Sequence, residues 1–174
     1  DRIYQSCLGY FSKPGANPYN IWFSRMESLI KASLNMSYYD GSCCHLDIVQ
    51  WATNPVWRGL PNESIQEMLE ADLPFLKKLI SNSQIELILI NGKTTLNEFK
   101  KLFGDNIISG EDFILAIDEN PANRLKMQHG KLIIDRKEVF YVGWNLYRQQ
   151  AIKQIHVDCL INAIKAHSTK LGLV

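Results

Sequence analysis

Residues 85–91, IELILIN, constrain the fold of this chain most, because their apolar run is nearly continuous and is bounded by polar residues. Such a run is typical of a strand that is covered on both faces. A strand of this kind needs packing partners on both sides of its sheet. The segment therefore favours a sheet with helices on both faces.

Helical and strand patterns alternate along the rest of the chain. Apolar residues at three- and four-residue steps predict helices, and short apolar runs between turn residues predict strands and a hairpin. The expected helices are 19–34, 64–81 with Asn62 as cap and a kink or break at Pro74, 94–103 ended by Gly104, and 152–167. The expected strands are 43–50, 85–91, 111–117 and 137–143, with hairpin arms 124–127 and 131–135 around Gln128-His129-Gly130. The alternation predicts one domain over residues 1–174, a three-layer α/β/α sandwich with a mostly parallel central sheet.

Charge and cysteine content argue against a polybasic nucleic-acid-binding protein, a zinc site and a disulfide framework. The 19 Lys and Arg residues nearly balance the 18 Asp and Glu residues, so any contact with nucleic acid must be local. The four cysteines lack the paired spacing of a zinc site and form no obvious disulfide framework, so a reducing, cytoplasmic setting is expected. No apolar run approaches the roughly 20 residues of a membrane-spanning helix. The chain starts at Asp1 without a methionine, so an upstream segment is expected to be missing.

Three segments follow predicted strands, where ligands bind in open α/β sheets. They are 46–55, 90–95 and 142–150. Asp47 fits either a turn cap or a pocket residue. Asn91 fits either a strand exit or a ligand contact, and Trp51 fits either packing or stacking on a ligand.

The third segment places five side chains of different chemistry in a row: Trp144, Asn145, Leu146, Tyr147 and Arg148. Aromatic and aliphatic wedges beside Arg are used to unstack a base and to hold the phosphates around it. A protein–protein rim uses the same residue types, so this composition leaves both interpretations open.

The order of these segments resembles the uracil-DNA glycosylase superfamily, closest to its mismatch-specific branch, over about residues 15–165. Residues 46–49 (LDIV) stand where the family has its base-reading strand motif, and 88–92 (ILING) where the next strand follows. Residues 143–146 (GWNL) stand where the family has its duplex-penetrating loop. That loop lacks the family's usual His, and Asp47 replaces its usual base-reading Asn.

Two placements of the family's motif A remain open. Residues 15–20 (GANPYN) resemble Gly-x-Asp/Asn-Pro-Tyr, which would make Asn17 the holder of the attacking water and Tyr19 a wall of the pocket. Residues 13–23 also resemble the stretch that follows motif A in the mismatch-specific branch. In that case motif A lies upstream of Asp1.

The resemblance implies a monomeric DNA repair enzyme that flips a modified or damaged pyrimidine and hydrolyses its N-glycosidic bond, with DNA as partner and no metal or other cofactor. The implied catalytic residues are Asn17, Asp47 and Asn145. The implied base contacts are Tyr19, Trp22, Trp51, Asn91 and Trp144, and the implied DNA contacts are Lys93, Leu146, Tyr147 and Arg148. An ionised Asp47 only accepts hydrogen bonds, so it favours a cytosine-type base over uracil.

Two other function classes fit the same residues. A member of the superfamily without catalysis would bind DNA or a protein partner, and the missing His favours this alternative. A small-molecule nucleoside or nucleotide hydrolase on a similar sheet is the other, because fold alone does not determine function.

Overall fold

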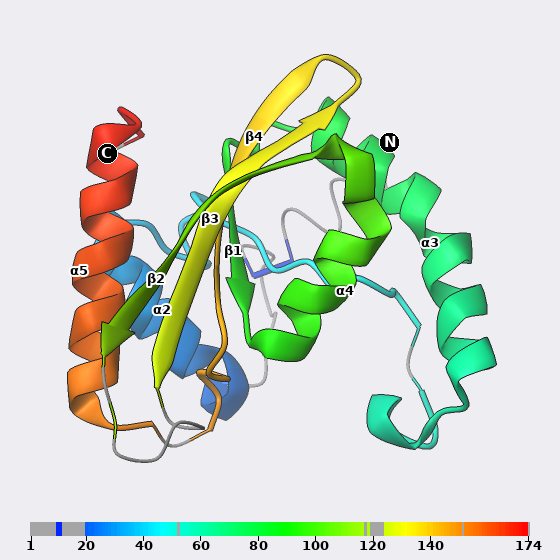
Figure 1. Cartoon of the computed structure of the whole chain (residues 1–174), viewed down its shortest axis with the longest axis horizontal. Coiled ribbons are helices and arrows are strands. Elements are labelled where there is room, and N and C mark those ends of the chain that lie inside the picture. Colours follow the sequence, from blue (N-terminus) through cyan, green and yellow to red (C-terminus); the bar gives the residue numbers. More distant parts are fainter. Residues whose placement is uncertain are drawn as a thin grey trace.

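The computed structural model of the protein describes residues 10–11, 20–51, 53–116, 118, 124–150 and 152–173. Its centre is an open four-stranded sheet with the strand order β1-β4-β3-β2 (Figure 1). The strands are β1 (Leu87–Asn91), β2 (Ile107–Ala116), β3 (Leu125–Ile134) and β4 (Lys137–Trp144). The described α-helices are α2 (Asn20–Leu34), α3 (Asn62–Asn82), α4 (Lys93–Phe103) and α5 (Gln154–Lys170), and two short 3₁₀ turns are η1 (Trp57–Gly59) and η2 (Gly104–Asn106).

The sheet is mixed and mainly antiparallel. Of the strands that the structure describes, β1 and β4 are the one parallel pair, whereas β3 is antiparallel to both β4 and β2. The α/β class is confirmed, but the mostly parallel sheet of a three-layer sandwich was wrong. The reason lies in the connection between β3 and β4, which consists of Asp135 and Arg136 alone. A parallel pair needs a crossover of about a dozen residues or more.

The hairpin turn also differs from the prediction. It lies at Asp135 and Arg136, whose φ angles of 49° and 70° suit the left-handed geometry of a two-residue hairpin turn. Residues 128–130 instead lie inside the continuous strand β3. Gly130 is needed there for close approach, because a Cβ atom would lie 2.3 Å from the carbonyl oxygen of Ile108.

Residues 43–50 form no strand, which corrects the prediction for this segment. Leu46 and Ile48 pack against the apolar cluster of α3, α4 and β1, while Asp47 between them is exposed. The alternation of faces is therefore present without a hydrogen-bonded ladder. Among the described residues β1 pairs only with β4, so β1 is an edge strand beside this segment.

The four predicted helices are all present, close to their expected bounds. Gly104 ends α4 as predicted, and its N–H bonds to the carbonyl of Lys100. Asn62 is the first residue of α3 and Pro61 takes the cap position instead. Pro74 lies inside α3 and does not divide it.

Helices cover both faces of the sheet. On one face α2 and α5 pack over Val142 and Trp144, and on the other α3 and α4 pack over Val139 and Tyr141. These four positions alternate along β4, as the two-residue period of a strand requires. The carboxyl ends of β1 and β4 therefore come together between the two helical layers.

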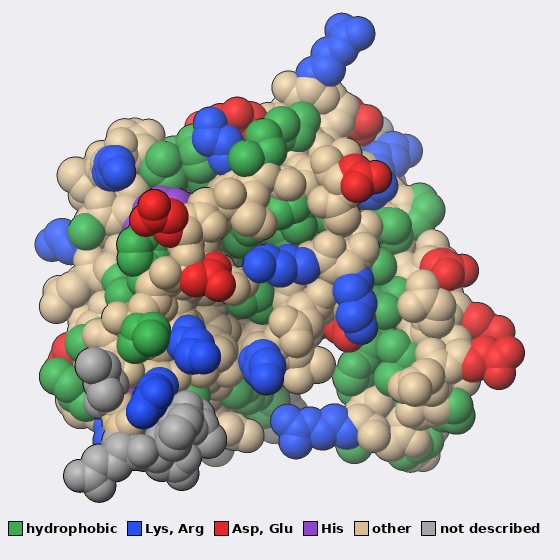
Figure 2. Space-filling view, in the orientation of Figure 1, with side chains coloured by type: hydrophobic (Ala, Val, Ile, Leu, Met, Phe, Trp, Pro, Cys, Tyr) green, Lys and Arg blue, Asp and Glu red, His purple; other side chains and the backbone are tan. Residues whose placement is uncertain are grey.

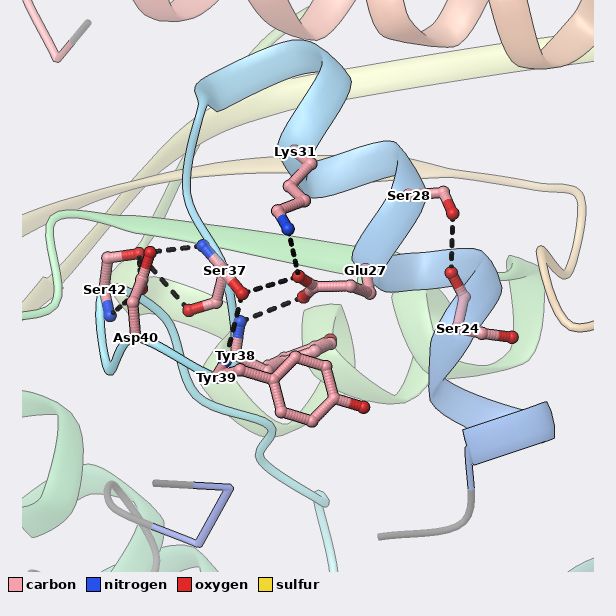
Figure 3. Close-up of polar contacts among 9 residues, drawn as sticks. All are labelled: Ser24, Glu27, Ser28, Lys31, Ser37, Tyr38, Tyr39, Asp40 and Ser42. Carbon is pink, nitrogen blue, oxygen red and sulfur yellow. Dashed lines mark hydrogen bonds and ion pairs between the residues drawn. The ribbon is translucent and has the colours of Figure 1, made fainter. Parts of the chain in front are cut away.

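A buried carboxylate shapes the chain that follows α2 (Figure 3). Glu27, only 8 % exposed, accepts hydrogen bonds from the Ser37 hydroxyl (2.5 Å) and the Tyr38 backbone N–H (3.0 Å). The Ser37 N–H in turn donates to the Ser42 hydroxyl (2.8 Å), and the Ser37 carbonyl accepts from the Cys43 N–H (3.3 Å). This network folds residues 35–43 against α2 and fixes where the following segment meets the sheet.

Replacing Glu27 with Ala is expected to lower the free energy of unfolding by about 1–3 kcal/mol, because buried donors at Ser37 and Tyr38 lose their acceptor. Urea denaturation measures this change. The control is Glu67→Ala at an exposed position of α3, which should change stability by less than about 0.5 kcal/mol. Equal effects of the two substitutions would contradict the structural role of Glu27.

Candidate functional site

A cleft of about 1400 Å³ opens between α2, the segment 41–51, β1, the start of α4 and the loop that follows β4. Its walls come from parts of the chain that are far apart in sequence. Five of the predicted site residues line it together: Trp22, Asp47, Trp51, Asn91 and Tyr147. The predicted Asn17 and Tyr19 lie outside the described residues.

Trp144 and Leu146 do not reach the cleft. Trp144 is 0 % exposed and belongs to the core beneath α2 and α5, so it is neither a platform for a base nor a wedge. Leu146 packs against the same cluster. The prediction of Trp144 as an exposed wedge was therefore wrong, because the alternation along β4 turns this ring inward. Leu146 is half-buried, and its contact with DNA stays a prediction.

Asn145 uses both ends of its side-chain amide to hold the backbone. Its Oδ1 accepts from the Lys126 N–H (2.7 Å), and its Nδ2 donates to the carbonyl of Arg124 (2.8 Å). These bonds tie the end of β4 to the start of β3. A catalytic role would require Nδ2 of Asn145 to donate to the leaving base. This group already donates to the carbonyl of Arg124.

Asn91, the last residue of β1, shapes the loop after β4 with three hydrogen bonds. Its Oδ1 accepts from the Trp144 indole N–H (3.1 Å) and from the Arg148 backbone N–H (2.9 Å). Its Nδ2 donates to the side-chain oxygen of Gln149. Asn91 lines the cleft, but its polar atoms position the loop rather than a ligand.

Tyr147 is the residue of this loop that faces the cleft. Its ring lies edge-on to Trp22 at 5.8 Å between ring centroids. It also lies over Gly92, where a Cβ atom would be 2.9 Å from the Tyr147 ring and where φ is 98°. Burial, and secondarily the nearby Asp47 carboxylate, raise the pKa of the Tyr147 phenol, while Arg58 opposes the shift. The phenol therefore stays neutral and can both donate and accept hydrogen bonds.

Asp47 projects from the cleft wall, and its side chain is 70 % exposed. Its Oδ1 lies 3.4 Å from Nε2 of His45, whose ring packs edge-on against Phe23 at 5.0 Å. The carboxylate thus has an imidazole beside it and solvent in front of it. Within the described part of the chain, no group of three His, Cys, Asp or Glu side chains is arranged to hold a metal ion.

Trp51 presents its ring at the mouth of the cleft and is 65 % exposed. Its indole N–H donates to Oδ1 of Asp72 (3.1 Å), and the Gln50 N–H donates to Oδ2 of the same carboxylate (2.6 Å). Asp72 lies on α3, so this helix fixes the direction of the ring.

Four cationic residues, Arg25, Lys93, Lys126 and Arg148, lie where β1 and β4 end. The backbone of Lys93 and of Lys126 bonds to Asn145, and Nη1 of Arg25 donates to the carbonyl of Gln149. Burial, and then the nearby Arg25, lower the pKa of Arg148. Across the described residues none of these four cations forms an ion pair. Figure 2 shows Lys and Arg side chains in the lower part of the view, where Figure 1 places these strand ends.

Four residues of the site were missed from the sequence: Arg25, His45 as the partner of Asp47, Lys126 and Gln149. Arg25 and Lys126 lie on α2 and β3, and only the tertiary fold brings them to the loop after β4. Gln149 lies within the segment 142–150 that was predicted to follow a strand, but it was not singled out as a site residue.

No protein-family model matches this chain, and neither a curated protein nor a solved structure does. No helix in the described ranges is long and apolar enough to cross a membrane. The geometry of the cleft is therefore the basis for assigning a function.

Replacing Asn91 with Ala is expected to lower the free energy of unfolding by about 1–3 kcal/mol, because the buried indole N–H of Trp144 loses its acceptor. Urea denaturation followed by tryptophan fluorescence measures the change. Asn91→Asp keeps the acceptor and should cost less. Asn97→Ala, at an exposed position of α4, is the matched control, and an effect as large as that of Asn91→Ala would refute this role.

Proposed function

We propose that this protein binds nucleic acid, with the backbone on the cationic rim and the bases directed into the cleft. The observation that carries the proposal is the convergence of Arg25, Lys93, Lys126 and Arg148 in a chain whose net charge is only +1. Contacts to phosphate supply most of the affinity of proteins for nucleic acid. A local cluster of this kind attracts a polyanion even when the whole protein is nearly neutral.

The residues that line the cleft differ in charge from the four cationic residues beside it. Asp47, Glu86 and Glu98 line the cleft, and so do the rings of Trp22 and Tyr147. Carboxylates repel phosphate, whereas aromatic rings stack on bases. This division supports an arrangement in which bases enter the cleft and the backbone stays at the rim.

The size of the cleft bears on the alternative of a small-molecule hydrolase. Pockets for small molecules usually measure about 300–1,000 Å³. The cleft, at about 1400 Å³, exceeds this range. Its volume therefore favours a polymer over a single nucleoside or nucleotide.

The lysines of the rim provide a test of the binding proposal. The double substitution Lys93→Ala and Lys126→Ala should weaken binding of a labelled DNA oligonucleotide. It should also lower the log–log salt slope by about 0.7 per lost contact on a single strand, or about 0.9 on a duplex. Fluorescence anisotropy at several salt concentrations measures both effects. Lys165→Ala, an exposed position of α5, is the control with a matched charge change. Unaltered binding by the double variant would show that Lys93 and Lys126 do not contact the nucleic acid.

Base excision is a second, more specific candidate. It is favoured by the resemblance to the uracil-DNA glycosylase superfamily and by the position of Asp47 in the cleft beside His45 and near Tyr147. In this reaction the bond from the base nitrogen to the sugar carbon breaks and the base leaves with the electron pair. Water adds its oxygen to the carbon, and the proton that it loses neutralises the departing base. Asp47 would accept a hydrogen bond from an amino group of the base. Asn17 would orient the water, if motif A lies at residues 15–20.

A base-release assay tests excision. Wild type is expected to release cytosine or a modified cytosine in preference to uracil, and Asp47→Asn should shift the preference toward uracil, because an amide both donates and accepts. Release of each base from otherwise identical oligonucleotides is measured by chromatography. Asp158→Asn, on the exposed side of α5, controls for the change in charge. Efficient uracil release that Asp47→Asn leaves unchanged would remove Asp47 from base recognition.

A further inference from the structure

The loop after β4 does not present the exposed pair of wedges that was expected to open a duplex. Proteins that unstack paired bases insert an exposed apolar wedge between them. Of the two residues expected to do so, Trp144 is buried in the core beneath α2 and α5, and Leu146 is half-buried against the same cluster. Asn91 accepts a hydrogen bond from the indole N–H of Trp144. This hydrogen bond, together with packing, keeps the Trp144 ring inside the core.

The cleft instead offers aromatic surfaces to bases that are already unpaired. Trp51 and Trp22 are 65 % and 43 % exposed, and Tyr147 lies edge-on to Trp22. The three rings come from three separate parts of the chain and line one cleft. Such platforms bind successive bases of a single strand, because every unpaired base has a free face.

The charges of the cleft and of the residues beside it also favour a single strand over a duplex. A duplex holds its bases inside two ribbons of phosphate, so bases reach the cleft only if phosphates come close to Asp47 and Glu86 as well. A single strand can turn its bases inward and leave its one backbone on the rim near Lys93 and Arg148. We propose that the cleft is a binding site for single-stranded DNA.

This inference rests on the proposed nucleic-acid function, and one experiment separates the two. Fluorescence anisotropy compares a labelled oligonucleotide of about 12 nucleotides, within the site sizes of single-strand-binding folds, with its own duplex at equal salt. The single strand is expected to bind at least about tenfold more tightly. Equal or tighter binding of the duplex overturns the single-strand inference but leaves nucleic-acid binding intact. Binding of neither form overturns both.

Substitutions of Trp51 locate the bases. Trp51→Ala should weaken single-strand binding by roughly 5- to 150-fold, which is the loss of affinity expected when one base loses its stacking partner. Trp51→Phe keeps a ring and should restore most of the affinity. Phe113→Ala removes an exposed ring from β2, at the opposite edge of the sheet, and should leave binding unchanged. If Trp51→Ala binds as wild type does, or if Phe113→Ala weakens binding equally, stacking in the cleft is refuted.

Discussion

The side chain of Asn91 connects the sheet to the site. One amide at the end of β1 bonds to a core indole, to the backbone of Arg148 and to Gln149, so the path of the loop after β4 follows from the position of β1. Because β1 and β4 are the parallel pair, their carboxyl ends meet, and one side chain can reach across both. Arg148 and the ring of Tyr147 both take their positions from that loop.

Local patterns predicted the helices and, close to their bounds, β1 and β4, whereas pairing between distant segments was not predictable. An amphipathic stripe or an apolar run lies within one window of sequence. The partner of a strand does not, and residues 43–50 have the alternation of a strand without a ladder. Gly130 was assigned to a turn because its need for close contact with Ile108 appears only in the folded sheet. The actual turn at Asp135 and Arg136 lacks a glycine and gave a weaker signal.

The site shows the same division. The rule that ligands bind where strands end correctly placed Asn91 and Tyr147 in the cleft. Asp47 and Trp51 line the same cleft although the strand predicted before them is absent, and Trp22, implied by the family resemblance, reaches it from α2. The rule failed for Trp144 and Leu146, since residue type does not reveal which side of the strand end a ring will face. It also gave no reason to include Arg25, which reaches the loop from α2 only through the packing of that helix.

On one side β1 pairs with no strand of the described residues, and this has a consequence for the behaviour of the chain in solution. An edge strand with apolar side chains is a template on which another molecule can add a strand, and proteins commonly protect such edges with loops and charges. Here Leu46 and Ile48 pack beside that edge, and Glu86 stands at its start. The segment that carries Asp47 therefore also covers this edge and hinders the addition of a strand from another molecule. Substitutions that loosen this segment to widen the cleft would therefore increase aggregation.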